Sequence, residues 1–366
     1  MPAMIQCINC GNGYPEKGIP YLCDKCGGIY EFSNQPILNL AQVERSQPGI
    51  WKYAHTFGLP KDCEPVSLGE GETPLVWANI FQRKIAFKCE FQNPSGSFKD
   101  RGSSVIVGLL KSRGIHQAVE DSSGNAGASF AAYATRAGIQ AEIFIPESAS
   151  GPKRRQISAY GAVLTTIAGS RSDVTLAARK KVNTDRVYAS HAYLPLNVPG
   201  YATAAYETYE QLGEKMPGAV IVPAGQGGFL HGLLFGFNQL RIATNRSLPL
   251  PMMIGVQISS CNPLMELFVN GKRNPEKRKS ITTLAEGVNV QNPVRGNEVI
   301  KTIKSSGGKI YEVTEKTILP GMDSLARLGF YIEPTSALVW PILVEHIDDL
   351  PDPVVVILTG SGFKHG

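Results

Sequence analysis

The stretch Ala219-Val-Ile-Val-Pro-Ala-Gly-Gln-Gly-Gly228 indicates the fold class of this chain. Its apolar residues do not alternate with polar ones, which is typical of a strand buried on both faces of a parallel sheet. A glycine-rich turn follows directly, and residues 228–241 after it predict a helix. A buried strand, a tight turn and a helix in this order form the repeating unit of α/β proteins.

The same succession continues on both sides of this stretch. Further apolar runs predict strands around Val119 and at residues 141–145, 162–167, 252–258 and 354–358. The intervening segments predict helices at residues 102–112, 126–137, 151–159, 174–182 and 203–212. Alternating strands and helices predict a mostly parallel α/β sheet with helices on both faces. Residues 36–65 contain four prolines and predict a connector with one short helix near residues 38–45.

The composition is that of a globular chain with about two domains. The chain has 366 residues, and domains contain roughly 150 residues each. Its 43% apolar share is enough for a substantial core, and its 18% charged share is too low for a disordered chain. A net charge of +5 is weak for this length, so we expect no nucleic-acid partner. Most of this charge lies in residues 272–279, which predict a solvated loop.

The apolar segments are also too short for a membrane protein. None reaches the ~18 apolar residues of a membrane span. The first residues do not combine a basic region with an apolar run, so they do not resemble a signal peptide. We therefore expect a cytoplasmic protein without a membrane partner.

Four of the seven cysteines form two CxxC pairs, Cys7-Ile-Asn-Cys10 and Cys23-Asp-Lys-Cys26, each followed by glycine. Two such turns supply four thiolates, which is the closed tetrahedral shell of a structural zinc site. The sequence therefore predicts a zinc ribbon over residues 1–35. A redox dithiol pair is the alternative, but no βαβ pattern surrounds these cysteines. DNA binding is a second alternative, but it has little support because only two lysines lie in this segment.

Three glycine-rich turns come where a strand is expected to end and a helix to begin. In α/β sheets, ligands bind at the carboxyl ends of the strands. Backbone amides and helix N-termini at such turns suit an anion. The turns are Asp121-Ser-Ser-Gly-Asn-Ala-Gly127, Pro223-Ala-Gly-Gln-Gly-Gly228 and Thr359-Gly-Ser-Gly362.

Lys99 lies in the segment Asn93-Pro-Ser-Gly-Ser-Phe-Lys-Asp-Arg-Gly102. The turn residues and the aromatic Phe98 predict a sheltered position for its amine. A sheltered lysine loses its proton more readily and can act as a nucleophile.

These motifs, in this order, resemble those of the fold-type II pyridoxal-phosphate enzymes, and within them the threonine synthase group. The motifs are NPSGSFKDRG (93–102), SSGNAG (122–127), PAGQGG (223–228) and LTGSG (358–362). The four-cysteine segment extends the resemblance, as do SLGEGETPLV (67–76), AAYATRAG (131–138), GYATAAYE (200–207) and GVQ (255–257). The resemblance implies two open, mostly parallel α/β lobes, similar to the tryptophan synthase β fold, preceded by the zinc ribbon.

It also implies an order of domains along the chain. Residues 1–35 form the ribbon, and residues 36–94 form the connector and the first part of a large cofactor-binding lobe. Residues 95–200 form a small lobe, and residues 201–366 complete the large one.

The resemblance further implies roles for individual residues toward pyridoxal 5′-phosphate. Lys99 would hold the cofactor covalently and move the α-proton of the substrate, with Phe98 packed near the ring. Asn125 would bond the phenolic oxygen, and Thr359 would face the pyridine nitrogen. The amides of Gly225, Gln226, Gly227 and Gly228 would bind the phosphate. Ser122, Ser123 and Gly124 would receive the substrate carboxylate.

The sequence departs from the threonine synthase pattern at four positions. Ala126 and Gly127 stand where a threonine and a serine are usual, and Leu194 and Asn197 stand where an asparagine and a basic residue are usual. In the family these residues help to receive the phosphate of the substrate, and a dianion needs donors and positive charge.

The predicted function is that of a lyase of amino-acid metabolism. The leading hypothesis is conversion of phosphohomoserine to threonine and phosphate. One alternative is a threonine or serine ammonia-lyase, or a β-replacement synthase similar to cysteate or cysteine synthase. Another is a catalytically silent zinc-ribbon partner protein. By analogy with relatives, the resemblance also suggests a homodimer.

Overall fold

The computed structural model describes residues 4–34, 36–147, 149, 151–244, 248–273 and 282–365. The chain forms two compact units: a first unit of Met1–Glu70 with Lys99–Gly200, and a second unit of Gly71–Phe98 with Tyr201–Gly366. Most of the basic run at residues 272–279 lies outside the described residues. Among the described residues, no helix has the length and apolar character needed to cross a bilayer.

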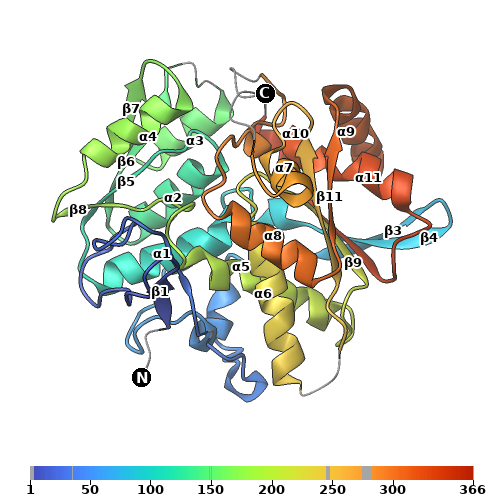
Figure 1. Cartoon of the computed structure of the whole chain (residues 1–366), viewed down its shortest axis with the longest axis horizontal. Helices are drawn as coiled ribbons and strands as arrows, with labels where there is room; N and C mark the ends of the chain where they lie inside the picture. The colour runs from blue at the N-terminus through green and yellow to red at the C-terminus, as the bar shows by residue number, and fades with distance from the viewer. Residues whose placement is uncertain are drawn as a thin grey trace. The chain divides into compact units, whose positions relative to one another are not determined.

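The second unit is built on a six-stranded sheet (Figure 1). Its strands, in spatial order, are β11 (Lys309–Val313), β10 (Met252–Ile258), β9 (Ala219–Pro223), β12 (Val354–Ile357), β4 (Arg83–Lys88) and β3 (Leu75–Ile80). All neighbours are parallel except β3 and β4, which form an antiparallel hairpin. Every residue of β9 and β12 is buried, which confirms the prediction of strands covered on both faces.

Helices and short 3-10 segments connect these strands. The helices are α6 (Gly228–Ala243), α7 (Pro263–Asn270), α8 (Gly296–Ser305), α9 (Ile318–Arg327), α10 (Pro334–Ala337) and α11 (Val339–His346). The 3-10 segments are η3 (Glu90–Gln92), η5 (Glu286–Val288), η6 (Glu315–Thr317) and η7 (Gly362–Lys364). Helix α5 (Asn197–Gln211) contains the boundary between the two units.

The first unit is built on a four-stranded parallel sheet in the order β7 (Val163–Ile167), β6 (Gln140–Pro146), β5 (Gln117–Glu120) and β8 (Arg186–Tyr188). Its helices are α1 (Lys99–Ser112), α2 (Asn125–Arg136), α3 (Pro152–Ala159) and α4 (Arg171–Lys180). Helix α4 begins at a capping box in which Ser170 and Asp173 bond each other's backbone amides. Two sheets of mostly parallel strands connected by helices confirm the α/β part of the predicted fold.

The N-terminal part of the first unit contains little regular structure. Strands β1 (Ile5–Cys7) and β2 (Tyr30–Phe32) pair antiparallel. The helix expected near residues 38–45 is only a 3-10 turn, η1 (Leu40–Gln42), and a longer 3-10 segment, η2 (Gly49–Thr56), follows. The buried Trp51 of η2 donates its indole N–H to Ser104 Oγ at 2.7 Å. This bond attaches the connector to α1.

Candidate functional site

The turn after β9 forms a cradle of backbone amides at the start of α6. Gly227 is the N-cap in the left-handed region at φ +77, and no side chain caps the helix. A Cβ on Gly227 would lie 2.7 Å from Val299 Cγ1, so only glycine fits this position without a shift. Amides in the first turn of a helix have no intrahelical acceptor and attract an anion. The geometry of this turn fits a phosphate group.

The two residues before Gly227 keep the cradle open. A Cβ on Gly225 would lie 2.5 Å from the carbonyl oxygen of Gly287. Gln226 turns its side chain away toward the next loop, where Oε1 accepts a hydrogen bond from Val294 N at 3.0 Å. The phosphate-binding role of residues 225–228 stays a prediction, but nothing in their geometry opposes it.

Thr359, at the end of β12, is 2% exposed and bonded to Ser336 of α10. Ser336 Oγ accepts hydrogen bonds from Thr359 N at 2.9 Å and from Gly360 N at 3.0 Å. The proton of Ser336 Oγ has two acceptors within reach, Thr359 Oγ1 at 3.0 Å and the carbonyl oxygen of Gly360 at 3.4 Å. These bonds hold Thr359 in place at the end of β12.

The third glycine turn differs from the prediction in one respect. Residues 359–362 lead into η7 (Gly362–Lys364), a single turn of 3-10 helix, and not into an α-helix. We therefore expect no helix dipole at this turn, and its contribution comes from side-chain and backbone hydrogen bonds.

The loop that precedes Lys99 pairs with the C-terminal segment. Phe98 N donates to Thr359 O at 3.1 Å, and Ser361 N donates to Gly96 O at 3.0 Å. Lys364 is buried, and its Nζ donates to Ser95 O at 2.7 Å. The Phe98 ring stacks on Phe229, with 4.3 Å between the ring centroids. These contacts fix Phe98, the residue directly before Lys99, within the second unit.

In the first unit, Lys99 begins α1, and the predicted substrate loop connects β5 to α2. Residues 122–125 are all partly exposed, between buried residues on either side. Gly124 is the N-cap of α2 in an extended conformation, and its amide donates to Ser122 Oγ at 3.2 Å. Asn125 is the first residue of α2. The loop therefore presents partly accessible backbone amides and hydroxyls at a helix N-terminus, which suits a carboxylate.

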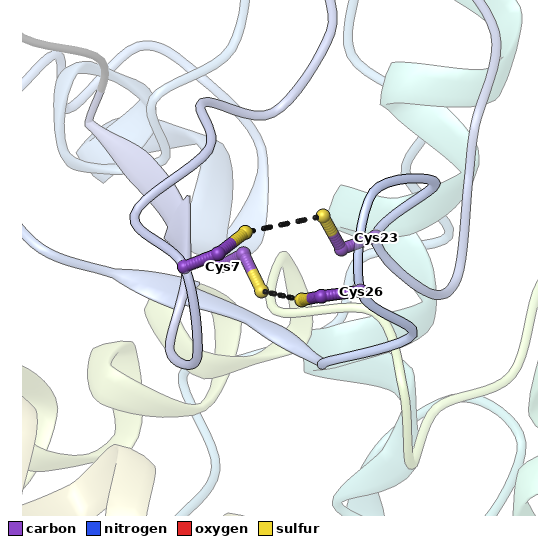
Figure 2. Close-up of side chains that lie close together, drawn as sticks. Cys7, Cys23 and Cys26 are labelled. Carbon is purple, nitrogen blue, oxygen red and sulfur yellow. Dashed lines mark hydrogen bonds between the residues drawn. The ribbon is translucent and has the colours of Figure 1, made fainter.

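The four N-terminal cysteines converge as a metal site requires (Figure 2). The Sγ atoms of Cys7 and Cys26 are 3.5 Å apart, those of Cys10 and Cys23 are 3.7 Å apart, and all four lie within 4.8 Å of one another. A tetrahedral zinc ion with Zn–S bonds of ~2.3 Å places its sulfur ligands ~3.8 Å apart. The same distances are far too long for disulfide bonds, which measure ~2.05 Å. The donor set and its spacing fit zinc.

Comparisons with known proteins agree with these geometries. The family described as "Pyridoxal-phosphate dependent enzyme" matches residues 66–360. The threonine synthase of Methanosarcina acetivorans is 32% identical, and the alignment covers 98% of this chain and 92% of the relative. The threonine synthase of Methanocaldococcus jannaschii has the same identity and the same two coverages. This chain belongs to the threonine synthase family of pyridoxal-phosphate-dependent enzymes.

Solved structures outside the threonine synthases have the same fold. A threonine deaminase of T.th. superposes with a TM-score of 0.66 and 25% identity, covering 79% of this chain and 92% of that one. An L-serine ammonia-lyase of Rhizomucor miehei superposes with a TM-score of 0.69 and 22% identity, covering 81% of this chain and 95% of that one.

The structure gives a physical reason for one departure from the threonine synthase family. A Cβ on Gly127 would lie only 1.9 Å from the carbonyl oxygen of Ser122, so the loop in this conformation excludes the usual serine. Ala126, Leu194 and Asn197 are buried, so these departures lie beneath the surface of the first unit.

Three residues beside the predicted set were missed from the sequence: Ser336, Glu120 and His191. Ser336 lies on a four-residue helix that the sequence did not predict. Glu120 directly precedes the predicted substrate loop, and its carboxyl contacts His191, 71 residues later, at 2.8 Å. An acidic residue at the end of a predicted strand was a usable signal for Glu120, whereas nothing local marked His191.

Proposed function

We propose that this chain is a threonine synthase, which converts phosphohomoserine and water into threonine and phosphate. The observation that carries the proposal is its 32% identity to threonine synthases over 98% of the chain. Because the match extends over nearly the whole chain, the candidate lysine, the glycine turns and the N-terminal segment all lie within the compared region.

Within this proposal, each predicted residue keeps its role toward the cofactor. The amides of residues 225–228 bind its phosphate, and the side chains of Phe98 and Asn125 contact the ring and its phenolic oxygen. Lys99 forms the covalent link and moves the α-proton. When bound, pyridoxal phosphate supplies an electron sink for the negative charge that develops at the α-carbon.

Thr359 tunes that sink. Its hydroxyl would donate a hydrogen bond to the pyridine nitrogen. A hydroxyl cannot protonate this nitrogen as a carboxylic acid would, so the sink is moderate. A moderate sink suits elimination and replacement reactions better than transamination.

The substrate carboxylate binds to Ser122, Ser123 and Gly124 in this proposal. These residues lie directly before α2, and the partial positive charge at its N-terminus favours an anion.

We also propose that Cys7, Cys10, Cys23 and Cys26 bind one zinc ion with a structural role. Four thiolates fill its coordination shell and leave no open position for catalysis. The ribbon packs on the sheet of the first unit, where Tyr21 lies edge-on to Tyr188 with 4.9 Å between centroids. Metal analysis of the purified protein should find one zinc per chain, and a chelator should lower the melting temperature. Retention of the full melting temperature after zinc removal would contradict a structural role.

Substrate assays test the proposed reaction. Purified protein is incubated separately with phosphohomoserine, threonine, serine and phosphoserine. Threonine and phosphate formed from phosphohomoserine support the proposal. Release of a keto acid from threonine or serine instead would identify an ammonia-lyase, which the missing donors at Ala126 and Gly127 favour as the second candidate.

Borohydride trapping tests the assignment of Lys99. Reduction should attach a pyridoxyl group to the peptide that contains Lys99. The Lys99→Ala variant should form no adduct, and its activity should be at least ~10²-fold lower than that of the wild type. Lys111→Ala is the matched control, because Lys111 lies on the same helix in an exposed ion pair with Glu64. An adduct on another lysine would refute the assignment, and the absence of any adduct would favour a silent partner protein.

The homodimer, the cytoplasmic location and the domain boundaries remain predictions. Light scattering of the purified protein at two concentrations measures its oligomeric state directly.

A further inference from the structure

A buried acid and a histidine meet at the end of the first unit's sheet from which the predicted substrate loop emerges. Glu120 is the last residue of β5, and the loop to α2 follows it. Strand β8 runs parallel to β5, with Val119 opposite Tyr188, and Ala189 N donates to Val119 O at 2.9 Å. His191 comes shortly after this pairing ends. The topology therefore places both side chains at the same carboxyl edge.

The contact between the two side chains is specific. His191 Nδ1 lies 2.8 Å from Glu120 Oε1, while the His191 side chain is 20% exposed and that of Glu120 only 1%. The side-chain amide of Asn197 donates a hydrogen bond to the carbonyl oxygen of His191 and fixes the backbone of His191. The imidazole thus lies between a fully buried carboxyl and the accessible side of the unit.

The surroundings of Glu120 favour its neutral form. Oε2 of Glu120 is buried and has no hydrogen-bond partner among the described residues. An ionised carboxylate there would leave one charged oxygen without a donor, which costs on the order of several kcal/mol in a buried site. Burial raises the pKa of Glu120 well above its usual range, and the nearby charge of Asp121 adds to this effect.

The same surroundings keep His191 neutral. Burial lowers the pKa of His191 well below its usual range, and the positive charges of Lys99 and Arg171 act in the same direction. With Glu120 protonated, its O–H donates to Nδ1, and a neutral imidazole then carries its single proton on Nε2. The pair therefore carries its transferable proton on His191, the more exposed of the two side chains.

The neighbouring carboxyl is in the opposite state. Although burial opposes ionisation, Arg171 and the hydroxyl of Thr175 lower the pKa of Asp121. Arg171 Nη1 lies 2.9 Å from Asp121 Oδ2, and Thr175 Oγ1 donates to the same oxygen at 2.6 Å. Two adjacent carboxyls whose pKa values are driven apart are a recurring sign of an acid–base site. The other titratable group close to the pair is Tyr188, whose phenol is buried.

We propose that Glu120 stores a proton that His191 delivers to the leaving group of the bound amino acid. The inference rests on the proposed function, in which the leaving group is phosphate. After Lys99 has moved the α-proton, it removes a β-proton, and the electron pair of that C–H bond forms a second bond between the β- and γ-carbons. As the bond between the γ-carbon and oxygen breaks, both of its electrons go to the oxygen. The oxygen takes the proton from His191 Nε2, and the proton of Glu120 moves to Nδ1. Glu120 regains a proton from solvent through His191 after the product leaves.

This assignment complements the role of Lys99. Lys99 gains the β-proton while Glu120 gives a proton up, so the new positive and negative charges lie near each other and offset. A phosphate that leaves with a proton also needs less positive charge around it. That helps to explain how the chain functions with Ala126 and Gly127, which provide no side-chain donors.

The test separates proton delivery from the step at the α-carbon. In Glu120→Gln and His191→Gln, we expect kcat for product formation to fall by ~10²- to 10⁴-fold with little change in KM. Exchange of the substrate α-proton in D2O, which depends on Lys99, should change less than about threefold. His116→Gln is the matched control, because His116 is an exposed histidine of the same unit.

The pH profile provides a second criterion. A donor whose pKa is raised is intact below that pKa and is lost as the pH rises through it. Wild-type kcat should therefore decline at high pH, and the profile of Glu120→Gln should lack this decline. Equal losses of exchange and product formation would show that the pair only supports the loop and would overturn the proposal, as would unchanged product formation.

An infrared measurement on the cofactor-free protein gives a readout independent of activity. The difference spectrum of wild type minus Glu120→Gln at neutral pH should show the carbonyl band of a protonated carboxylic acid. A carboxylate band alone would overturn the proposal. If the wild type does not convert phosphohomoserine, the proposed function fails, and the same comparison is made with serine, whose departing hydroxyl also needs a proton.

Discussion

The two units each carry a glycine turn between a strand and a helix, but the turns are built differently. Residues 223–228 in the second unit present backbone amides, and the one polar side chain, Gln226, points elsewhere. Residues 121–127 in the first unit present hydroxyls and a carboxamide, with Glu120 and Asp121 behind them. A backbone site recognises a phosphate whatever reaction follows. A side-chain site can differ between enzymes that share the cofactor, so we expect substrate choice to depend on the first unit.

Changing the backbone cradle should have the largest effect. Gly227→Ala places a Cβ in the left-handed region and against Val299, at a cost of roughly 1–2 kcal/mol before the clash is counted. We expect cofactor affinity to fall by about tenfold or more, measured by titrating the cofactor-free protein. Gly213→Ala has a similar φ but no atom within 4 Å of the new Cβ, so it isolates the backbone strain. Equal affinities for the two variants would contradict the cradle.

Removing the Ser336 side chain, which bonds the turn at Thr359, should have an intermediate effect. Ser336→Ala leaves the buried amides of Thr359 and Gly360 without their acceptor. We expect the free energy of unfolding to fall by about 1–3 kcal/mol, measured in urea. The exposed Ser305 of α8 provides the control Ser305→Ala, which should change it little. A loss no larger than in this control would show that the amides find other partners.

The smallest effect is expected at the ion pair behind the substrate loop. The Arg171 side chain is 52% exposed, so Arg171→Ala should cost at most about 1 kcal/mol. Because Arg171 lowers the pKa of Asp121, its stabilising effect is present at neutral pH and lost as the pH falls through that pKa. Urea unfolding should show that the free energies of unfolding of wild type and Arg171→Ala differ at neutral pH and converge at acidic pH. The difference between wild type and the control Arg155→Ala should be the same at both pH values.

The sequence predicted six of the described parallel strands because their apolar runs are continuous, but it did not predict β8 and β11, which are also parallel. It missed the β3–β4 hairpin, whose two turn residues Phe81 and Gln82 adopt φ values of +44 and +69. Such turns normally contain glycine or asparagine, so the usual hairpin signal was absent. Helix α9 contains Pro320 and Gly321, which are read as helix breakers. In both places tertiary packing outweighs the local preference of the chain.

The candidate site also has parts that the sequence could predict and parts that it could not. Lys99, the glycine turns and the cysteine pairs lie in short contiguous motifs, so the sequence alone could nominate them as candidates. The contact between Glu120 and His191 joins residues 71 positions apart. It depends on β5 and β8 being neighbours in the sheet, and no local pattern encodes that pairing.

The pairing of the loop before Lys99 with residues 358–364 has a consequence for biosynthesis. Ser95 and Lys364, which form one of these bonds, are 269 positions apart. A ribosome therefore makes the candidate catalytic lysine long before it makes the residues that hold its loop in place. We expect nascent chains that end before residue 358 to carry Lys99 in an unsupported loop and to retain no cofactor, so capture of the cofactor would be one of the last events in the formation of this protein.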